Sequence, residues 1–119
     1  MTMPILDVEL YEAAPSGLAQ RLADAVAQAL ATPPGHTWVR LHPQDPRHYA
    51  ENGVSVAPGD LPVFIIILHR EPPQGVALES EVRALTALVA AVLGKSPERV
   101  HLRYGVAAAG RQAFGGNLV

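Results

Sequence analysis

The sequence predicts an α/β fold of two fused βαβ units, in which four strands form one sheet and two helices cover one face. A strand-like run headed by a proline occurs at Pro4 and again at Pro62, and each is followed by a helical stretch and a second strand-like run. A constant offset of 63 residues relates the two helical stretches and the strands that follow them, so that Arg40 corresponds to Arg103. A period this long, with strand–helix–strand inside it, is typical of duplicated βαβ units.

The first half supplies one unit. Residues 4–10 alternate between apolar and acidic side chains, which predicts a strand with one buried face. Ser16 is placed to cap a helix whose apolar stripe includes Leu22 and Val26. Prolines and a glycine at 32–35 end that helix, and the second strand covers residues 37–41.

The second half repeats this order after a proline-rich segment at 42–61, for which we expect a short hairpin or a packed excursion. The strand at 63–68 has no polar side chain, so we expect it to be covered on both faces, one of them by a neighbouring subunit. A helical stripe from 78 to 93 ends at Gly94, and a fourth strand covers 100–104. The tail at 105–119 could lie across the sheet edge of another chain.

Length and composition indicate a single domain, residues 1–119, with internal repeats at about 4–53 and 62–116. The chain has no cysteine, which excludes disulfides and thiol chemistry. Its nine Lys and Arg residues are scattered and its net charge is -2, which argues against nucleic acid. The longest apolar run is too short to cross a bilayer, and no signal peptide is evident, so we expect a cytoplasmic protein without a membrane partner.

Three histidines recur every six residues, at His36, His42 and His48, but their strand and loop placement gives no common metal-binding face. Pro4 is chemically distinctive in one circumstance only. As a free N-terminal residue it would be a secondary amine and a possible base, whereas as an internal residue its nitrogen is an amide without basicity.

Four features together give the chain a family resemblance: Met3-Pro4 before a strand, the fused repeat, the Thr32-Pro33-Pro34 run, and residues 96–100, Ser-Pro-Glu-Arg-Val. On these features the chain resembles the tautomerase superfamily. Within it, the chain is similar to macrophage migration inhibitory factor, the malonate semialdehyde decarboxylases and the cis-3-chloroacrylic acid dehalogenases. The resemblance spans residues 4 to about 119.

The resemblance implies the tautomerase fold, a homotrimer with sites between subunits, and a cofactor-free isomerase or tautomerase that acts on a small carboxylate. Its catalytic residue is an amino-terminal proline, and Pro4 is the matching position. Proton transfer in a keto–enol tautomerisation needs a base with a pKa near neutrality, and an α-amino group has one of about 7.7–8.0. Read without the resemblance, Pro4 is simply the residue that begins a strand.

The resemblance also implies a substrate-binding set. Arg70 looks like a carboxylate-binding arginine of the dehalogenase-like members, and arginine grips a carboxylate with a planar fork. Arg103 and His101 stand where relatives have substrate-contacting residues. Arg40 matches the strand arginine of the short 4-oxalocrotonate tautomerases, and Phe114 stands where an aromatic wall is found. From the residues alone, each arginine could equally be a solvated strand end, and Phe114 could be subunit core.

Two departures keep a second hypothesis open. Met1, Thr2 and Met3 precede Pro4, and no acidic residue matches the water-activating glutamate of the dehalogenases, because Phe114 is there. Hydrolytic dehalogenation is therefore disfavoured, and decarboxylation lacks the aspartate that the resemblance would require. Either the mature chain starts at Pro4 and is a tautomerase, or Pro4 stays blocked and the chain is a catalytically silent trimer that serves as a binding or structural module.

Overall fold

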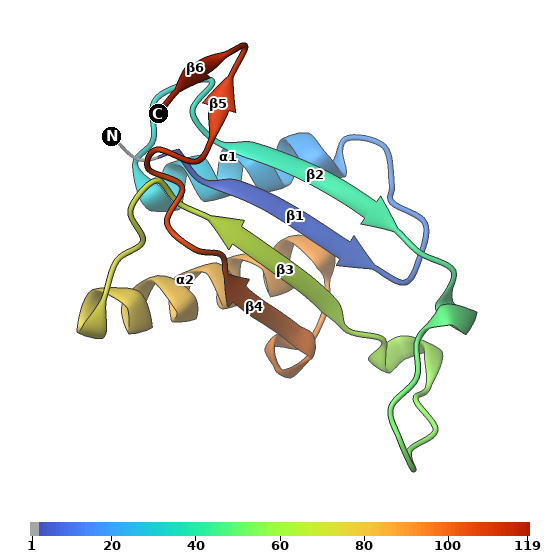
Figure 1. Ribbon diagram of the computed structural model, residues 1–119. Coiled ribbons are helices and arrows are strands. Elements are labelled where there is room, and N and C mark those ends of the chain that lie inside the picture. Colours follow the sequence, from blue (N-terminus) through green and yellow to red (C-terminus); the bar gives the residue numbers. More distant parts are fainter. Residues whose placement is uncertain (1–2) are drawn as a thin grey trace.

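In the computed structural model, which describes residues 3–119, one four-stranded sheet is covered on one face by two helices (Figure 1). Met1 and Thr2, on which the question of a blocked Pro4 depends, lie outside the described residues. The helices and strands are β1 (Ile5–Leu10), α1 (Leu18–Leu30), β2 (Trp38–Pro43), β3 (Val63–Leu68), α2 (Gly75–Leu93), β4 (Val100–Tyr104), β5 (Ala113–Phe114) and β6 (Asn117–Leu118). Single 3₁₀ turns cover Pro46–His48, Pro58–Asp60 and Pro97–Arg99.

The sheet confirms the predicted duplication. Its strand order is β2-β1-β3-β4, and each unit contributes one parallel pair, β1 with β2 and β3 with β4. The two units meet at the centre, where β1 and β3 run antiparallel. Each parallel pair needs a crossover, and α1 and α2 provide the two crossovers on the same side of the sheet. Among the described residues, no helix is both long and apolar enough to cross a membrane.

The core lies between the sheet and the helices. Alternate residues of the two central strands point into it, as the period of two requires, while the apolar stripes of α1 and α2 close it from the other side. Burial of each such side chain stabilises the fold by about 1.5–3 kcal/mol. The most deeply buried members are Leu6, Val8, Leu10, Leu22, Val26, Val63, Ile65, Ile67, Leu85 and Val89.

The opposite face of the sheet, which we call the open face, carries no helix (Figure 1). On β3 it presents Phe64 and Ile66, each 40% exposed. Within a single chain, β3 is therefore covered on one face only. The other face is the one that we expected a neighbouring subunit to cover. Both crossover helices lie on the same side, which leaves these two apolar side chains facing solvent.

The start of α1 differs from the prediction. Gly17, with φ of 81°, is the N-cap residue, and no side chain makes a capping hydrogen bond there. Ser16 was predicted to cap this helix, and that prediction is wrong. The left-handed conformation of Gly17, which glycine adopts without a steric penalty, turns the chain into the helix one residue later.

The two helices end at repeat-related positions with different residues. Ala31 and Gly94, 63 residues apart in the sequence, both adopt the left-handed conformation after the last helical turn, with φ of 54° and 67°. The predicted cap at Gly94 is confirmed. Alanine in this conformation has a steric cost that glycine lacks.

This pair yields a matched stability prediction. Gly94→Ala should destabilise the protein by about 1 kcal/mol, whereas Ala31→Gly should stabilise it by a smaller amount, because glycine also raises the entropy of the unfolded chain. No atom lies within 4 Å of a Cβ placed on Gly94, so strain alone should produce the effect. Thermal unfolding of both variants at one protein concentration checks the prediction, and changes of equal sign would contradict it.

The segment between β2 and β3 projects beyond the end of the sheet (Figure 1). Its first turn is capped by Asp45, whose carboxylate accepts the Arg47 backbone N–H at 2.8 Å. At the tip, an isolated antiparallel bridge joins Glu51 to Val54, which agrees with the expected short hairpin. Arg99 fastens this segment to the body by donating to the Glu51 carboxylate at 2.9 Å.

The tail folds back onto its own chain. β5 and β6 form a small hairpin beside the start of β1 (Figure 1), closed by a hydrogen bond from Val119 N–H to the Gln112 carbonyl at 3.0 Å. Phe114 and Val119 pack against a second cluster of buried residues that contains Met3 and Ile5. Within one chain the tail thus packs on the N-terminal end, because apolar side chains at both ends bury one another.

Candidate functional site

A pocket of about 550 Å³ opens where the start of β1, the start of β2, the end of β3 and the C-terminal hairpin meet. The strand register places these ends together, because Ile5 pairs with Trp38 on one side and with Leu68 on the other. Its lining is mainly apolar and aromatic, with one guanidinium. The lining includes Met3, His36, Trp38, Arg70, Phe114 and Val119.

Two aromatic rings form one wall of this pocket. Trp38 of β2 and Phe114 of β5 stack with ring centroids 4.6 Å apart and planes inclined by 19°. The wall therefore joins the tail to the sheet, and the apolar area of the stacked pair holds the hairpin in place. Phe114 lines the pocket, which is the position that its predicted role as an aromatic wall requires.

Arg70 supplies positive charge to the pocket. It follows the end of β3, its side chain is 40% exposed, and its nearest ion-pair partner is Glu71, with Nη1 and Oε1 3.9 Å apart. Its backbone carbonyl accepts the Ala109 N–H at 3.0 Å, which fixes the chain from which the guanidinium extends. The mainly apolar lining leaves this guanidinium available to a carboxylate.

Pro4 lies beside the pocket but does not line it. Its side chain is fully buried, and its carbonyl accepts the Trp38 N–H at 3.0 Å. Met3, which is bonded to the Pro4 nitrogen, does line the pocket and is only 3% exposed. The residue attached to that nitrogen thus occupies part of the space that a ligand of Pro4 would need.

Arg103 and His101 lie elsewhere, on the open face. They line a second hollow, of about 660 Å³, together with Phe64, whose ring centroid is 5.0 Å from that of His101. Arg103 pairs with Ile66 in the register of β3 and β4, whereas Arg70 lies four residues beyond Ile66, or about 13 Å along an extended chain. The predicted residues therefore form two groups that a single chain does not bring together.

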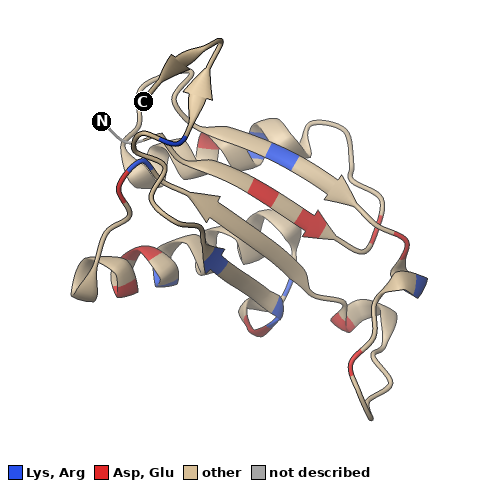
Figure 2. Cartoon of the chain, in the orientation of Figure 1, with Lys and Arg blue, Asp and Glu red and all other residues tan. Residues whose placement is uncertain are grey.

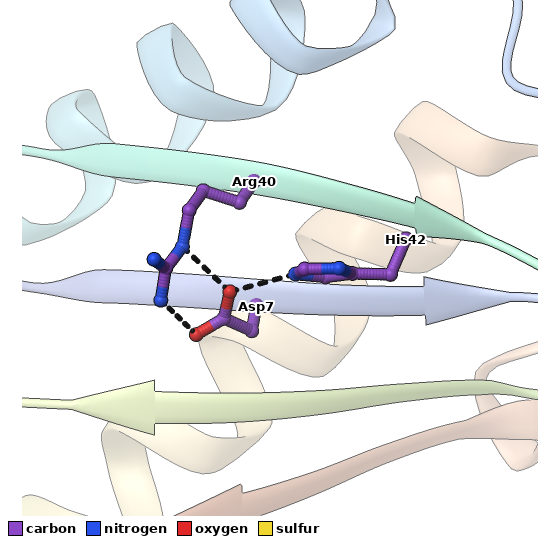
Figure 3. Close-up of polar contacts among 3 residues, drawn as sticks. All are labelled: Asp7, Arg40 and His42. Atoms are coloured by element: carbon purple, nitrogen blue, oxygen red, sulfur yellow. Dashed lines mark hydrogen bonds and ion pairs between the residues drawn. The ribbon is translucent and has the colours of Figure 1, made fainter.

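Arg40 is engaged in an ion pair on the open face. Its Nε and Nη2 donate to the two carboxylate oxygens of Asp7, both at 2.7 Å, and His42 Nε2 lies 2.8 Å from Asp7 Oδ1 (Figure 3). This arrangement follows from the parallel register, in which Asp7 pairs with Arg40. Acidic positions on β1 and basic positions on β2 and β4 are visible in Figure 2.

The repeat-related arginines Arg40 and Arg103 consequently differ in their surroundings. The cross-strand neighbour of Arg40 is Asp7, whereas that of Arg103 is Ile66. Within residues 3–119, Arg103 makes no ion pair. An incoming carboxylate would have to displace Asp7 to bind Arg40, but it would meet no such competitor at Arg103.

The Asp7 cluster predicts a dependence of stability on pH. Burial opposes ionisation of Asp7, but hydrogen bonds and charge from Arg40 and His42 outweigh it, so the Asp7 pKa falls below its ordinary value of 3.8. A lowered folded-state pKa stabilises the fold above the unfolded pKa, and this contribution is lost as pH falls through the folded pKa. Asp7→Asn should therefore cost about 0.2–1 kcal/mol at pH 7 and progressively less below about pH 4. Urea unfolding from pH 2.5 to 7 checks this, and a difference independent of pH would contradict it.

Several contacts at the site were not predicted from the sequence. His69, directly before Arg70, is buried, and its Nε2 lies 2.8 Å from the Glu81 carboxylate of α2. Neither residue carries a sequence signal, because the contact depends on how α2 packs beneath the sheet. His36 was not assigned to the predicted site, yet it lines the pocket. Among residues 3–119, no group of three or more metal-ligating side chains is arranged to hold a metal.

Comparisons with known proteins identify the fold. A structure described as Pt0534 inactivated by 2-oxo-3-pentynoate matches with a TM-score of 0.75 and 20% identity over 96% of this chain and 95% of that one. A fused 4-OT asymmetric trimer matches at 0.74 and 19%, over 96% and 94%. Macrophage migration inhibitory factor from Trichinella spiralis matches at 0.73 and 14%, over 97% and 99%.

These structures are members of the tautomerase superfamily, and the present chain has their fold, as its sequence predicted. No protein-family model and no curated protein sequence matches the chain. At these identities the similarity establishes the architecture, while the chemistry has to be argued from the residues themselves.

Proposed function

We propose that this protein is a cofactor-free tautomerase that transfers a proton between carbon and oxygen in a small 2-oxo or enol carboxylate. The main support is the position of Pro4, which immediately precedes β1 beside a largely apolar pocket that also presents Arg70. A base, an apolar chamber and a carboxylate-binding cation are what this reaction requires.

In the proposed reaction the mature chain begins at Pro4, so that its nitrogen is a secondary amine with a lone pair. This amine takes a proton from one end of the keto–enol system and returns it to the other, which leaves the amine unchanged overall. Arg70 holds the substrate carboxylate, while the stacked wall of Trp38 and Phe114 contacts the apolar part. Negative charge that develops on the carbonyl oxygen needs a further donor, and we assign that role to Arg103.

Arg103 can act at this pocket only from a second copy of the chain, so the proposal includes a homotrimer with sites between subunits. The open face supports this assembly, because Phe64 and Ile66 leave apolar surface that a neighbouring subunit could cover. The fused 4-OT structure, which has the same fold, is described as a trimer. His101, next to Arg103 on β4, would line the same intersubunit site. We place the protein in the cytoplasm.

The second candidate function is a binding module of the same fold without catalysis. Met3 favours it, because its buried side chain lines the pocket and its carbonyl carbon makes the Pro4 nitrogen an amide. In a chain that keeps residues 1–3, the pocket can still bind an apolar carboxylate through Arg70, but no base is available at Pro4.

Reaction with 2-oxo-3-pentynoate, which inactivates Pt0534, distinguishes the two functions. The full chain and a chain that begins at Pro4 are each incubated with the reagent, and intact mass and peptide mapping follow. The tautomerase proposal predicts one adduct on the Pro4 nitrogen of the shorter chain and none at Pro4 of the full chain. The mass of the protein purified from its native host then shows which form exists. A shorter chain that neither reacts nor ketonises phenylpyruvate would overturn the proposal.

A further inference from the structure

A buried polar cluster lies behind Arg70 and plays no part in the proposed reaction. Among residues 3–119, His69 is a buried polar residue with an exposed fraction of 3%. It directly follows the end of β3 and immediately precedes Arg70. Its Nε2 lies 2.8 Å from Glu81 Oε2, and the Tyr104 hydroxyl donates to the same oxygen at 2.6 Å. An ionised carboxylate only accepts hydrogen bonds, so His69 Nε2 carries the proton.

Three elements meet in this cluster. His69 comes from the end of β3, Glu81 from α2 and Tyr104 from β4, and the rings of His69 and Tyr104 lie nearly parallel at 12°, with centroids 5.9 Å apart. A buried donor without a partner is unfavourable, so the imidazole stays where Glu81 holds it. The side chain of His69 therefore has one defined position.

The backbone around His69 is held as firmly. The His69 carbonyl accepts the Ala108 N–H at 2.9 Å, and the Arg70 carbonyl accepts the Ala109 N–H at 3.0 Å. The Arg70 side chain itself has only the 3.9 Å contact with Glu71. The position of the Arg70 guanidinium in the pocket is therefore set by the backbone that His69 anchors, and not by partners of the Arg70 side chain.

We propose that Glu81 is a positioning residue that acts through His69 to hold Arg70 where it can bind a ligand carboxylate in the pocket. This inference rests on the proposed carboxylate-binding role of Arg70, but it does not depend on the Pro4 nitrogen. It holds equally for the tautomerase and for the binding module.

The test measures carboxylate preference, defined as the Kd of 3-phenylpropionamide divided by that of 3-phenylpropionate, in the full chain. The two probes have the same apolar body and differ in charge. Trp38, the sole tryptophan, lies in the pocket, so its fluorescence reports binding without any need for turnover. Arg70→Met should lower the preference about tenfold, because it removes a charge-assisted hydrogen bond.

Glu81→Leu should lower the same preference by about three- to tenfold while leaving the affinity for the amide nearly unchanged. Glu81→Gln keeps an acceptor oxygen for His69 and Tyr104, so it should restore most of the preference. Glu79→Leu is the matched control: it makes the same change on the exposed side of α2, and it should leave the preference at the wild-type value. Should Glu81→Leu fail to fold, His69→Phe tests the same link, since it retains the ring beside Tyr104 but cannot donate to Glu81.

Three results would overturn the inference. In the first, Glu81→Leu or His69→Phe is folded and keeps the wild-type preference. In the second, the affinities for acid and amide fall equally, which would indicate a structural role only. In the third, the wild type shows no preference or Arg70→Met retains it, and this result separately identifies failure of the proposed role of Arg70.

Discussion

Replacing Pro4 by alanine in a chain that begins at residue 4 is expected to lower kcat/KM for phenylpyruvate ketonisation by about 100-fold or more. General acid–base catalysis contributes roughly 10²- to 10⁴-fold, and alanine supplies a primary amine of different basicity and position at the same site. The buried ring of Pro4 also fixes the direction of its nitrogen, which the alanine amine would lose.

The control for this experiment is Arg83→Gln, a change on the exposed surface of α2 that leaves the pocket untouched. Its kcat/KM should equal that of the unsubstituted short chain. The full chain, in which Met3 makes the Pro4 nitrogen an amide, should be as inactive as Pro4→Ala. A rate that Pro4→Ala leaves unchanged would remove Pro4 from the reaction and favour the binding module.

Ile66→Arg is expected to convert the proposed homotrimer into single chains. Ile66 lies at the centre of the open face, between Asp7 on β1 and Arg103 on β4 in the strand register. A guanidinium there would be buried against a neighbouring subunit without a designed partner, at a cost of several kcal/mol per charge. Within one chain the fold should persist, because Ile66 lies on the open face and is already 40% exposed, so that the new side chain can extend into solvent.

Sedimentation velocity and circular dichroism give the readout, with Val76→Arg as the matched control. Val76 is 79% exposed on α2, on the helix side of the sheet, so the same change of residue should leave the assembly intact there. A trimer that tolerates Ile66→Arg would show that the open face is not the interface, and a wild-type protein that sediments as a single chain would contradict the assembly itself.

The fold could be predicted because each of its elements repeats a local pattern. Leu6 and Val8 alternate with Asp7 and Glu9, and that alternation fixes which face of β1 is buried whatever the rest of the chain does. The helical stripes and the cap at Gly94 are equally local. The prediction was wrong at Ser16, where a neighbouring glycine is the N-cap residue instead. The contact of the tail with the N-terminal end of its own chain was not predicted.

The candidate site was less predictable because its contacts join distant segments. Arg70 and Phe114 were expected in the site and do line one pocket, but nothing local indicates that Trp38 would stack on Phe114. The Asp7–Arg40 pair depends on strand register, and the contact of His69 with Glu81 depends on helix packing. The roles assigned to Arg103 and His101 remain predictions that need a second copy of the chain.

The unequal neighbours of Arg40 and Arg103 illustrate what a duplication makes possible. If the two βαβ halves were separate copies of one short polypeptide, a mutation that placed an aspartate beside the first arginine would place one beside the second as well. Once both halves belong to a single gene product, selection can neutralise one guanidinium with Asp7 and leave the other opposite Ile66. A fused chain can therefore evolve different surroundings at its two equivalent positions, whereas two copies of one short polypeptide cannot.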